Sequence, residues 1–351
     1  MSSTFFHDQG QDNSFTDYKG EYTMSKAFKE HLIITFPFML VCWGLCIILG
    51  FNGITKAEHL WINIPYILGA FSTTIASYIT LKKNGEVKGF KDWLKNVFDF
   101  RQSALSYIAV IILAALNTLV LCLAGGYEIK APLYMIILML PIMLFGGGLE
   151  EAGWRYITFP ALDKKFDFVP AAVIMGLIWA FWHLPLFFIP DVNQYGQNFL
   201  AFIFGCIGLS FILGAIRKVT GSVWLCVLMH MLTNAVPESI GYDFYGVKAQ
   251  LITMIIMATI STIWVKLYKK RVPRLFLNPK RRIFKPLDKS GIILLITHNP
   301  HLGSRHIPKS ADRHDIQIIE QHPLRCALSG IVKKSAVRKY PKSKIGRYQA
   351  A

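Results

Sequence analysis

Charged residues are scarce in this sequence of 351 residues, since Asp, Glu, Lys and Arg together make up only 17% of it. Hydrophobic residues make up 53%, and they occur in long uninterrupted runs. This balance excludes a disordered chain, which has low hydrophobicity and high charge. It also argues against an ordinary soluble domain, because so much apolar surface would need a very large core. The composition therefore predicts a membrane protein.

Metal-binding and secretory signals are also missing. The six cysteines show no CxxC or Cys/His spacing of the kind that holds structural zinc, so we interpret them as packing residues. The first thirty residues are polar and acidic, and they lack the basic start and short apolar core of a cleavable signal peptide. We expect the first apolar run to be a retained membrane anchor.

Eight apolar runs are long enough, at about 20 residues, to cross roughly 30 Å of hydrocarbon. They are too continuous for the alternating pattern of a membrane barrel. The sequence therefore predicts an all-α, polytopic membrane protein of about eight transmembrane helices. The runs lie near residues 31–51, 60–81, 103–124, 132–158, 168–188, 198–216, 221–239 and 247–267.

Basic residues are distributed unequally between the loops that such a topology places on opposite sides. Ten Lys and Arg residues fall on one side and three on the other. Because cytoplasmic loops are the richer in Lys and Arg, the asymmetry predicts an even number of crossings with both termini in the cytoplasm. We expect a multi-pass integral protein of the plasma membrane. The ten are Lys82, Lys83, Lys88, Lys91, Lys95, Arg101, Lys164, Lys165, Arg217 and Lys218, and the three are Lys56, Lys130 and Lys248.

Three regions follow from the composition: a polar N-terminal tail at 1–30, a transmembrane helical domain at 31–270, and a basic C-terminal tail at 271–351. From Lys269 to the end the chain has 20 basic and 4 acidic residues. We expect this tail to be poorly ordered and attracted to anionic lipid headgroups. Residues 89–101 place aromatic and aliphatic side chains at helical spacing between lysines, which predicts a helix in the membrane interface.

Ionisable residues inside the fourth apolar run need an explanation. Glu150, Glu151 and Arg155 lie within it, and one such group near the bilayer centre costs at least about 2.5–3.5 kcal/mol. Glu151 and Arg155 are four residues apart, so they share a helix face and can form an ion pair. Glu150 is offset by about 100° and can face another group.

Further polar side chains occur in two later runs: His183 in the fifth, and His230 with Asn234 in the seventh. Taken singly, each histidine is equally well explained as an interhelical hydrogen-bonding group. Taken together with Glu150 at similar depth, they match a site that activates water and stabilises an oxyanion. Alternatively, Glu150, His183 and His230 could bind zinc and leave one position for water. The residues alone leave both mechanisms open.

Other hydrolase signatures are missing: the sequence has no HExxH, no GxGD beside Tyr242-Asp243 and no GxSxG. Ser210 in the sixth run could pair with His230, but a serine among small residues is more typical of a helix-packing face. A serine mechanism is therefore a minor alternative.

Three motifs in chain order resemble those of the CPBP family of intramembrane proteases, which includes the type II CAAX prenyl endopeptidases and bacteriocin-immunity proteins. They are Glu150-Glu151-x-x-x-Arg155, Trp179-x-x-x-His183 and His230-x-x-x-Asn234. The family usually has Phe where this chain has Trp179. The resemblance covers about residues 132–240.

The resemblance implies a role for each motif residue. Glu150 and His183 would activate the water, His230 and Asn234 would stabilise the oxyanion, and Glu151 with Arg155 would orient the site. Members are classed as metalloproteases or as metal-free glutamate proteases, so a divalent metal such as zinc is an open expectation.

We therefore expect an endopeptidase of the CAAX prenyl type whose site opens to the cytoplasm. Its partners would be the lipid bilayer and a membrane-associated peptide, prenylated or not, and no nucleic acid. One alternative is a non-catalytic protein that confers bacteriocin self-immunity or acts as a scaffold. A proton-coupled transporter is a further alternative, because intramembrane Glu, His and Arg also mark proton pathways.

Overall fold

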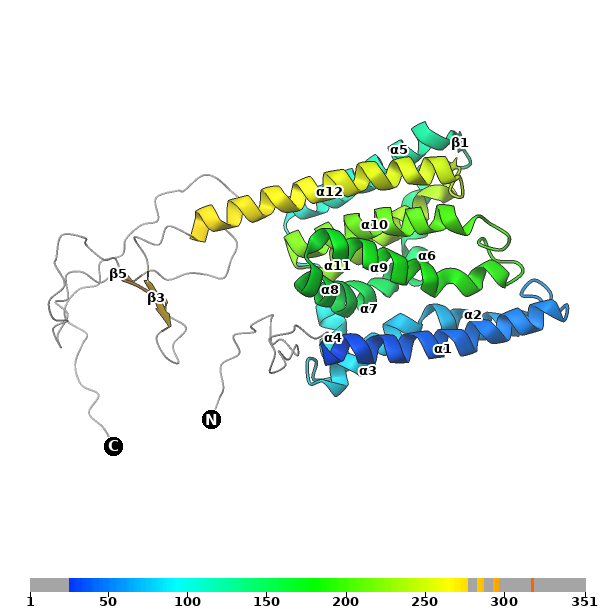
Figure 1. The fold of residues 1–351 in the computed structure, drawn as a ribbon, viewed down its shortest axis with the longest axis horizontal. Helices are drawn as coiled ribbons and strands as arrows, with labels where there is room; N and C mark the ends of the chain where they lie inside the picture. Colours follow the sequence, from blue (N-terminus) through cyan, green and yellow to red (C-terminus); the bar gives the residue numbers. More distant parts are fainter. Residues whose placement is uncertain (1–24, 277–282, 287–292, 297–316, 319–351) are drawn as a thin grey trace. The chain divides into compact units, whose positions relative to one another are not determined.

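A computed structural model describes residues 25–276, 283–286, 293–296 and 317–318. Within them the chain is a bundle of helices (Figure 1). The α-helices are α1 Lys26–Phe51, α2 Asn63–Ala70, α3 Ser72–Lys83, α4 Phe90–Val97, α5 Ala104–Gly125, α6 Met135–Phe145, α7 Glu151–Gly153, α8 Phe159–Phe166, α9 Phe168–His183, α10 Phe199–Thr220, α11 Val223–Ala235 and α12 Val247–Phe276.

Short helical turns and strands connect these helices. A π-helical turn, η3 Trp154–Thr158, joins α7 to α8. The other turns are 3₁₀: η1 Leu60–Ile62, η2 Gly148–Glu150, η4 Leu184–Phe188 and η5 Val236–Glu238. Strands β1 Tyr127–Ile129 and β2 Ile240–Tyr242 pair antiparallel, with Tyr127 opposite Tyr242. Three further strands form a separate antiparallel sheet in the order β3-β4-β5: β3 Ile283–Pro286, β4 Ile293–Ile296 and β5 Gln317–Ile318.

The predicted all-α polytopic fold is confirmed, but the number of spanning helices differs. By length and composition, the described residues contain five helices able to cross a membrane, or seven if each of two bent pairs is one span. The bent pairs are Leu60–Ala70 with Ser72–Lys83, and Met135–Phe145 with Gly148–Phe166, each bent by 45°. Seven of the eight predicted runs are thus accounted for.

The eighth predicted run, 221–239, contains the 13-residue helix α11. At 1.5 Å per residue α11 is about 20 Å long, which is shorter than the hydrocarbon layer. Leu225, Cys226 and Met229 on it are fully buried in the bundle. Its apolar residues contact protein rather than lipid, and α11 is not among the helices long enough to span by themselves, although it connects segments 217–218 and 236–248.

Close helix packing forms the core around α9 and α10. A Cβ at Gly176 of α9 would lie 2.6 Å from Ile207 Cα of α10, so only glycine permits this approach. Small residues at such contacts are typical of membrane helices, because lipid provides no hydrophobic force between them. The contact holds α9, which carries Trp179 and His183, against the rest of the bundle.

The predicted interface helix is present as α4. Trp93 and Val97 on it are buried, and the Trp93 indole donates a hydrogen bond to Ser77 Oγ at 3.1 Å. One face of α4 therefore packs against α3, and Phe90 stays exposed. Most of the two predicted tails, including all of 1–24, lies outside the described residues, so the expectations about them stay predictions.

Candidate active site

A break in the fourth predicted span places the acidic residues. Helix α6 ends at Phe145, and Gly147 has φ +141°, a conformation that glycine adopts far more readily than other residues. A Cβ at Gly147 would lie 2.5 Å from Asn234 Nδ2 and 2.8 Å from His230 Nε2. The Asn234 amide also donates to Gly146 O at 2.9 Å. The glycines therefore bring this backbone directly against α11.

Glu150 ends the 3₁₀ turn that follows the break. Only 9% of its surface is exposed, and the Trp179 indole donates a 2.8 Å hydrogen bond to its Oε2. His183 Nε2 lies 4.0 Å from its other oxygen, Oε1. Glu150 therefore faces α9, away from the ion pair formed by its neighbour in sequence.

The tautomer of His183 follows from its second contact. Its Nδ1 lies 2.9 Å from the carbonyl oxygen of Trp179. A carbonyl only accepts, so Nδ1 carries the hydrogen and, in the neutral ring, Nε2 presents a lone pair toward Glu150. Two acceptors thus face each other across 4.0 Å.

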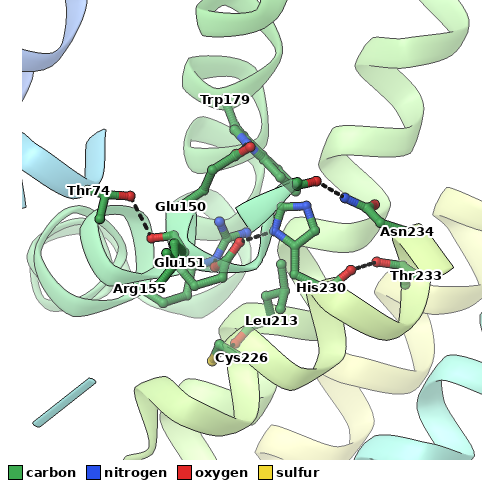
Figure 2. Close-up of polar contacts among 12 residues, drawn as sticks. Thr74, Glu150, Glu151, Arg155, Trp179, Leu213, Cys226, His230, Thr233 and Asn234 are labelled. Atoms are coloured by element: carbon green, nitrogen blue, oxygen red, sulfur yellow. Dashed lines mark hydrogen bonds and ion pairs between the residues drawn. The ribbon is translucent and has the colours of Figure 1, made fainter. Parts of the chain in front are cut away.

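Glu151 lies between a cation and an imidazole, as Figure 2 shows. Its Oε2 lies 3.2 Å from Arg155 Nε, and its Oε1 accepts from His230 Nδ1 at 2.9 Å. Glu151 and Arg155 are both fully buried. The Arg155 guanidinium also lies over the Trp179 ring, 4.9 Å from its centroid, which adds a cation–π attraction. Arg155 is on the π-helical turn, a feature frequent at functional sites.

A cavity of about 850 Å³ reaches this cluster. Glu150, Trp179, His183, His230 and Asn234 line its inner part. Glu151 and Arg155 do not line it, so they touch the cavity only through His230 and Trp179. Aromatic residues of α1 and the α2–α3 region, namely Trp43, Tyr66 and Phe71, add apolar wall.

The structure brings the six predicted site residues together as two contact groups in one region. One group is Glu150 with His183, and the other is Arg155, Glu151 and His230, with Asn234 beside the glycine break. Their chemical roles stay predictions. Sequence reasoning treated Trp179 only as an aromatic of the motif and missed its bond to Glu150. The signal was available, because Trp179 is four residues before His183 and so shares its helix face.

The serine alternative has no structural support among the described residues. Ser210 is fully buried, and its hydroxyl has no hydrogen-bond partner there. It therefore forms no dyad with His230.

The predicted zinc ligands do not converge. Within the described ranges, no group of three or more His, Cys, Asp and Glu side chains is arranged to hold a metal ion. Nδ1 of His230 is occupied by Glu151, and Nδ1 of His183 by a backbone carbonyl. These bonds leave Nε2 of both imidazoles available, and zinc binding by Glu150, His183 and His230 stays a prediction.

Comparison with known proteins agrees with the motif region. Residues 132–236 match the family model described as type II CAAX prenyl endopeptidase Rce1-like. A curated protein, CAAX prenyl protease 2 of Methanococcus maripaludis, is 24% identical over 233 residues, which cover 59% of this chain and 82% of that protein. These matches confirm the predicted resemblance to the CPBP proteases. Together with the apolar helices, they support a multi-pass integral membrane protein and an intramembrane endopeptidase.

Proposed function

We propose that this chain hydrolyses peptide bonds with a water activated by Glu150 and His183. The proposal depends on one observation, the pair of buried acceptors Glu150 Oε1 and His183 Nε2, 4.0 Å apart on the wall of a cavity. Two acceptors cannot bond each other, but one water can donate a hydrogen to each. Its oxygen then keeps its lone pairs for a substrate carbonyl.

Hydrolysis would proceed by attack of that water on the carbonyl carbon. Glu150 takes a proton from the water as the C–O bond forms, and the same proton passes to the nitrogen as the C–N bond breaks. The products are a carboxylic acid and an amine. Trp179, which donates to Oε2 of Glu150, leaves Oε1 to receive the proton.

His230 and Asn234 would stabilise the oxyanion that forms during attack. His230 donates through Nε2 when both ring nitrogens carry hydrogen, with the Nδ1 hydrogen donated to the Glu151 carboxylate. Glu151 and Arg155 act as positioning residues, since they hold His230 and Trp179 without lining the cavity. Removal of one oxyanion donor costs about 10²–10³ in kcat in other hydrolases.

The substrate we propose is a membrane-associated peptide. The name of the curated relative includes CAAX prenyl protease, so a prenylated C-terminal peptide is one candidate. An unmodified apolar peptide is the other, because Trp43, Tyr66 and Phe71 offer apolar surface that accepts either.

The test is cleavage by purified protein in liposomes, with a farnesylated CAAX peptide and its unmodified counterpart as probes. We expect Glu150→Gln and His183→Ala each to lower kcat by at least about 100-fold. Glu238→Gln is the matched control, because Glu238 lines the same cavity but is exposed and far along the chain from the proposed acid–base pair. Full activity of Glu150→Gln would refute the mechanism.

A metal-dependent form of the same reaction is tested separately. Metal analysis of the purified active protein, paired with a chelator, distinguishes it from the metal-free form. Suppose that the active protein holds stoichiometric zinc, that Glu150→Gln loses it, and that a chelator stops cleavage. The reaction would then be metal-dependent, and the metal-free mechanism proposed above would be wrong.

A further inference from the structure

The two ends of the helix bundle differ in charge. Segments 82–101, 163–167 and 217–218 carry ten basic and five acidic residues. Segments 52–59, 126–134, 189–198 and 236–248 carry three basic and also five acidic residues. The acidic residues are thus equal in number, and the difference is entirely in Lys and Arg.

Contacts show that each set of segments gathers at one end. At the basic end, Lys218 pairs with Asp163, and Asn96 of α4 donates to Tyr156. At the other end, β1 pairs with β2, and Asp191 accepts from the backbone of Ala57. Figure 1 places α4 and α8 at one end of the bundle and β1 at the opposite end. We call these the basic end and the β1 end.

The cavity opens at the β1 end. The exposed polar side chains that line it are Lys130, Asn193, Gln197, Glu238 and Asp243, all from the loops of that end. No lining residue comes from segments 82–101, 163–167 or 217–218. A peptide therefore reaches Glu150 through the β1 end.

These facts contradict one combination of the sequence predictions. Basic loops in the cytoplasm and a site that opens to the cytoplasm cannot both be true, because the cavity opens away from the basic loops. The charge bias is a rule of membrane insertion and applies to short loops such as these. The cytoplasmic opening had no comparable support.

We infer that the site is entered from the non-cytoplasmic side of the membrane, and that its substrate is a peptide segment exposed on that side. The identity of the substrate rests on the proposed endopeptidase function, whereas the side of entry does not. A lipidated protein confined to the cytoplasmic leaflet would not reach this entrance. The inference thus favours the unmodified peptide over the prenylated one.

Cysteine labelling tests the orientation without any need for catalysis. Gln197→Cys places a thiol at the cavity mouth, and Lys95→Cys places one on an exposed position of α4 at the basic end. Each variant is expressed in a bacterial host without an outer membrane and treated with a membrane-impermeant maleimide. The unsubstituted chain, with its six cysteines, gives the background labelling.

We expect intact cells to label Gln197→Cys at least about tenfold more than background. Lys95→Cys should label only after permeabilisation. A second pair, Glu58→Cys and Lys91→Cys, repeats the measurement at exposed positions outside the cavity. The reversed pattern, or equal labelling of both ends in intact cells, would overturn the inference. Because labelling does not depend on cleavage, such a result would leave the proposed hydrolysis standing.

Discussion

Trp179 is the one residue whose substitution separates a hydrogen bond to Glu150 from the packing around it. Trp179→Phe keeps an aromatic ring beneath Arg155 but removes the indole donor that lies 2.8 Å from Glu150 Oε2. A hydrogen bond to a charged group is worth about 1.5–3 kcal/mol. We expect kcat to fall about tenfold, with little change in KM, in the liposome cleavage assay.

The matched control is Trp224→Phe. Trp224 also donates its indole hydrogen to an oxygen, Tyr107 Oη at 3.0 Å, but it does not line the cavity. Trp224→Phe should lower the melting temperature but leave the kcat of the folded protein unchanged. Equal rates for Trp179→Phe and the unsubstituted chain would show that Glu150 does not need this donor, consistent with the Phe that the family usually has there.

Two substitutions separate the structural role of the buried Glu151–Arg155 pair from its role in holding His230. Glu151→Gln leaves a buried guanidinium without its carboxylate, which should lower the free energy of unfolding by about 3–5 kcal/mol. Adding Arg155→Met to it removes the orphaned charge, so the melting temperature in detergent should recover in part. Cleavage should stay low in the double variant, because His230 still lacks its carboxylate partner. Recovery of both the melting temperature and cleavage in the double variant would mean that the Glu151–Arg155 pair serves folding alone.

At the residue scale, the sequence was sufficient to select the six polar positions but not to connect them. Spacing of four predicted the Glu151–Arg155 pair, because both residues belong to one helix. The contacts of Glu150 with Trp179 and of Glu151 with His230 join different helices, 29 and 79 residues apart. Such contacts depend on how helices rotate and tilt, which helical periodicity does not determine.

At the element scale, the break before Glu150 is the feature that the site depends on most. Gly147→Ala would combine an unfavourable φ of +141° with a Cβ only 2.5 Å from Asn234 Nδ2. Strain of this kind costs about 1–3 kcal/mol. We expect loss of cleavage together with a lower melting temperature, measured on purified protein in detergent.

Gly85→Ala is the control for backbone strain alone. Gly85 also has a positive φ, +75°, but a Cβ there would meet nothing within 4 Å. It should lower stability slightly and leave cleavage intact. Normal cleavage by Gly147→Ala would show that the close approach of this backbone to α11 is not needed.

The elements also show which sequence signals are ambiguous. Apolar runs predicted helices correctly, yet hydropathy alone could not show that the run at 221–239 contains a short internal helix. Leu225 in α11 is fully buried, whereas Leu123 in α5 is 78% exposed, although both lie in equally apolar surroundings in the sequence. Lipid and protein interior are similar solvents for a leucine, so only the packed structure separates them.

At the scale of the whole molecule, the site and the basic tail belong to different parts of the chain. All six predicted site residues lie between 150 and 234, whereas 16 basic and 4 acidic residues follow Phe276. The chain also divides into separate compact units near residue 273. Truncation after Phe276 should therefore leave kcat/KM within about twofold in liposomes of neutral lipid, where headgroup attraction to the tail is absent. The unsubstituted full chain in the same liposomes is the reference. A loss of cleavage well beyond twofold, with the melting temperature unchanged, would mean that the tail contributes to the site.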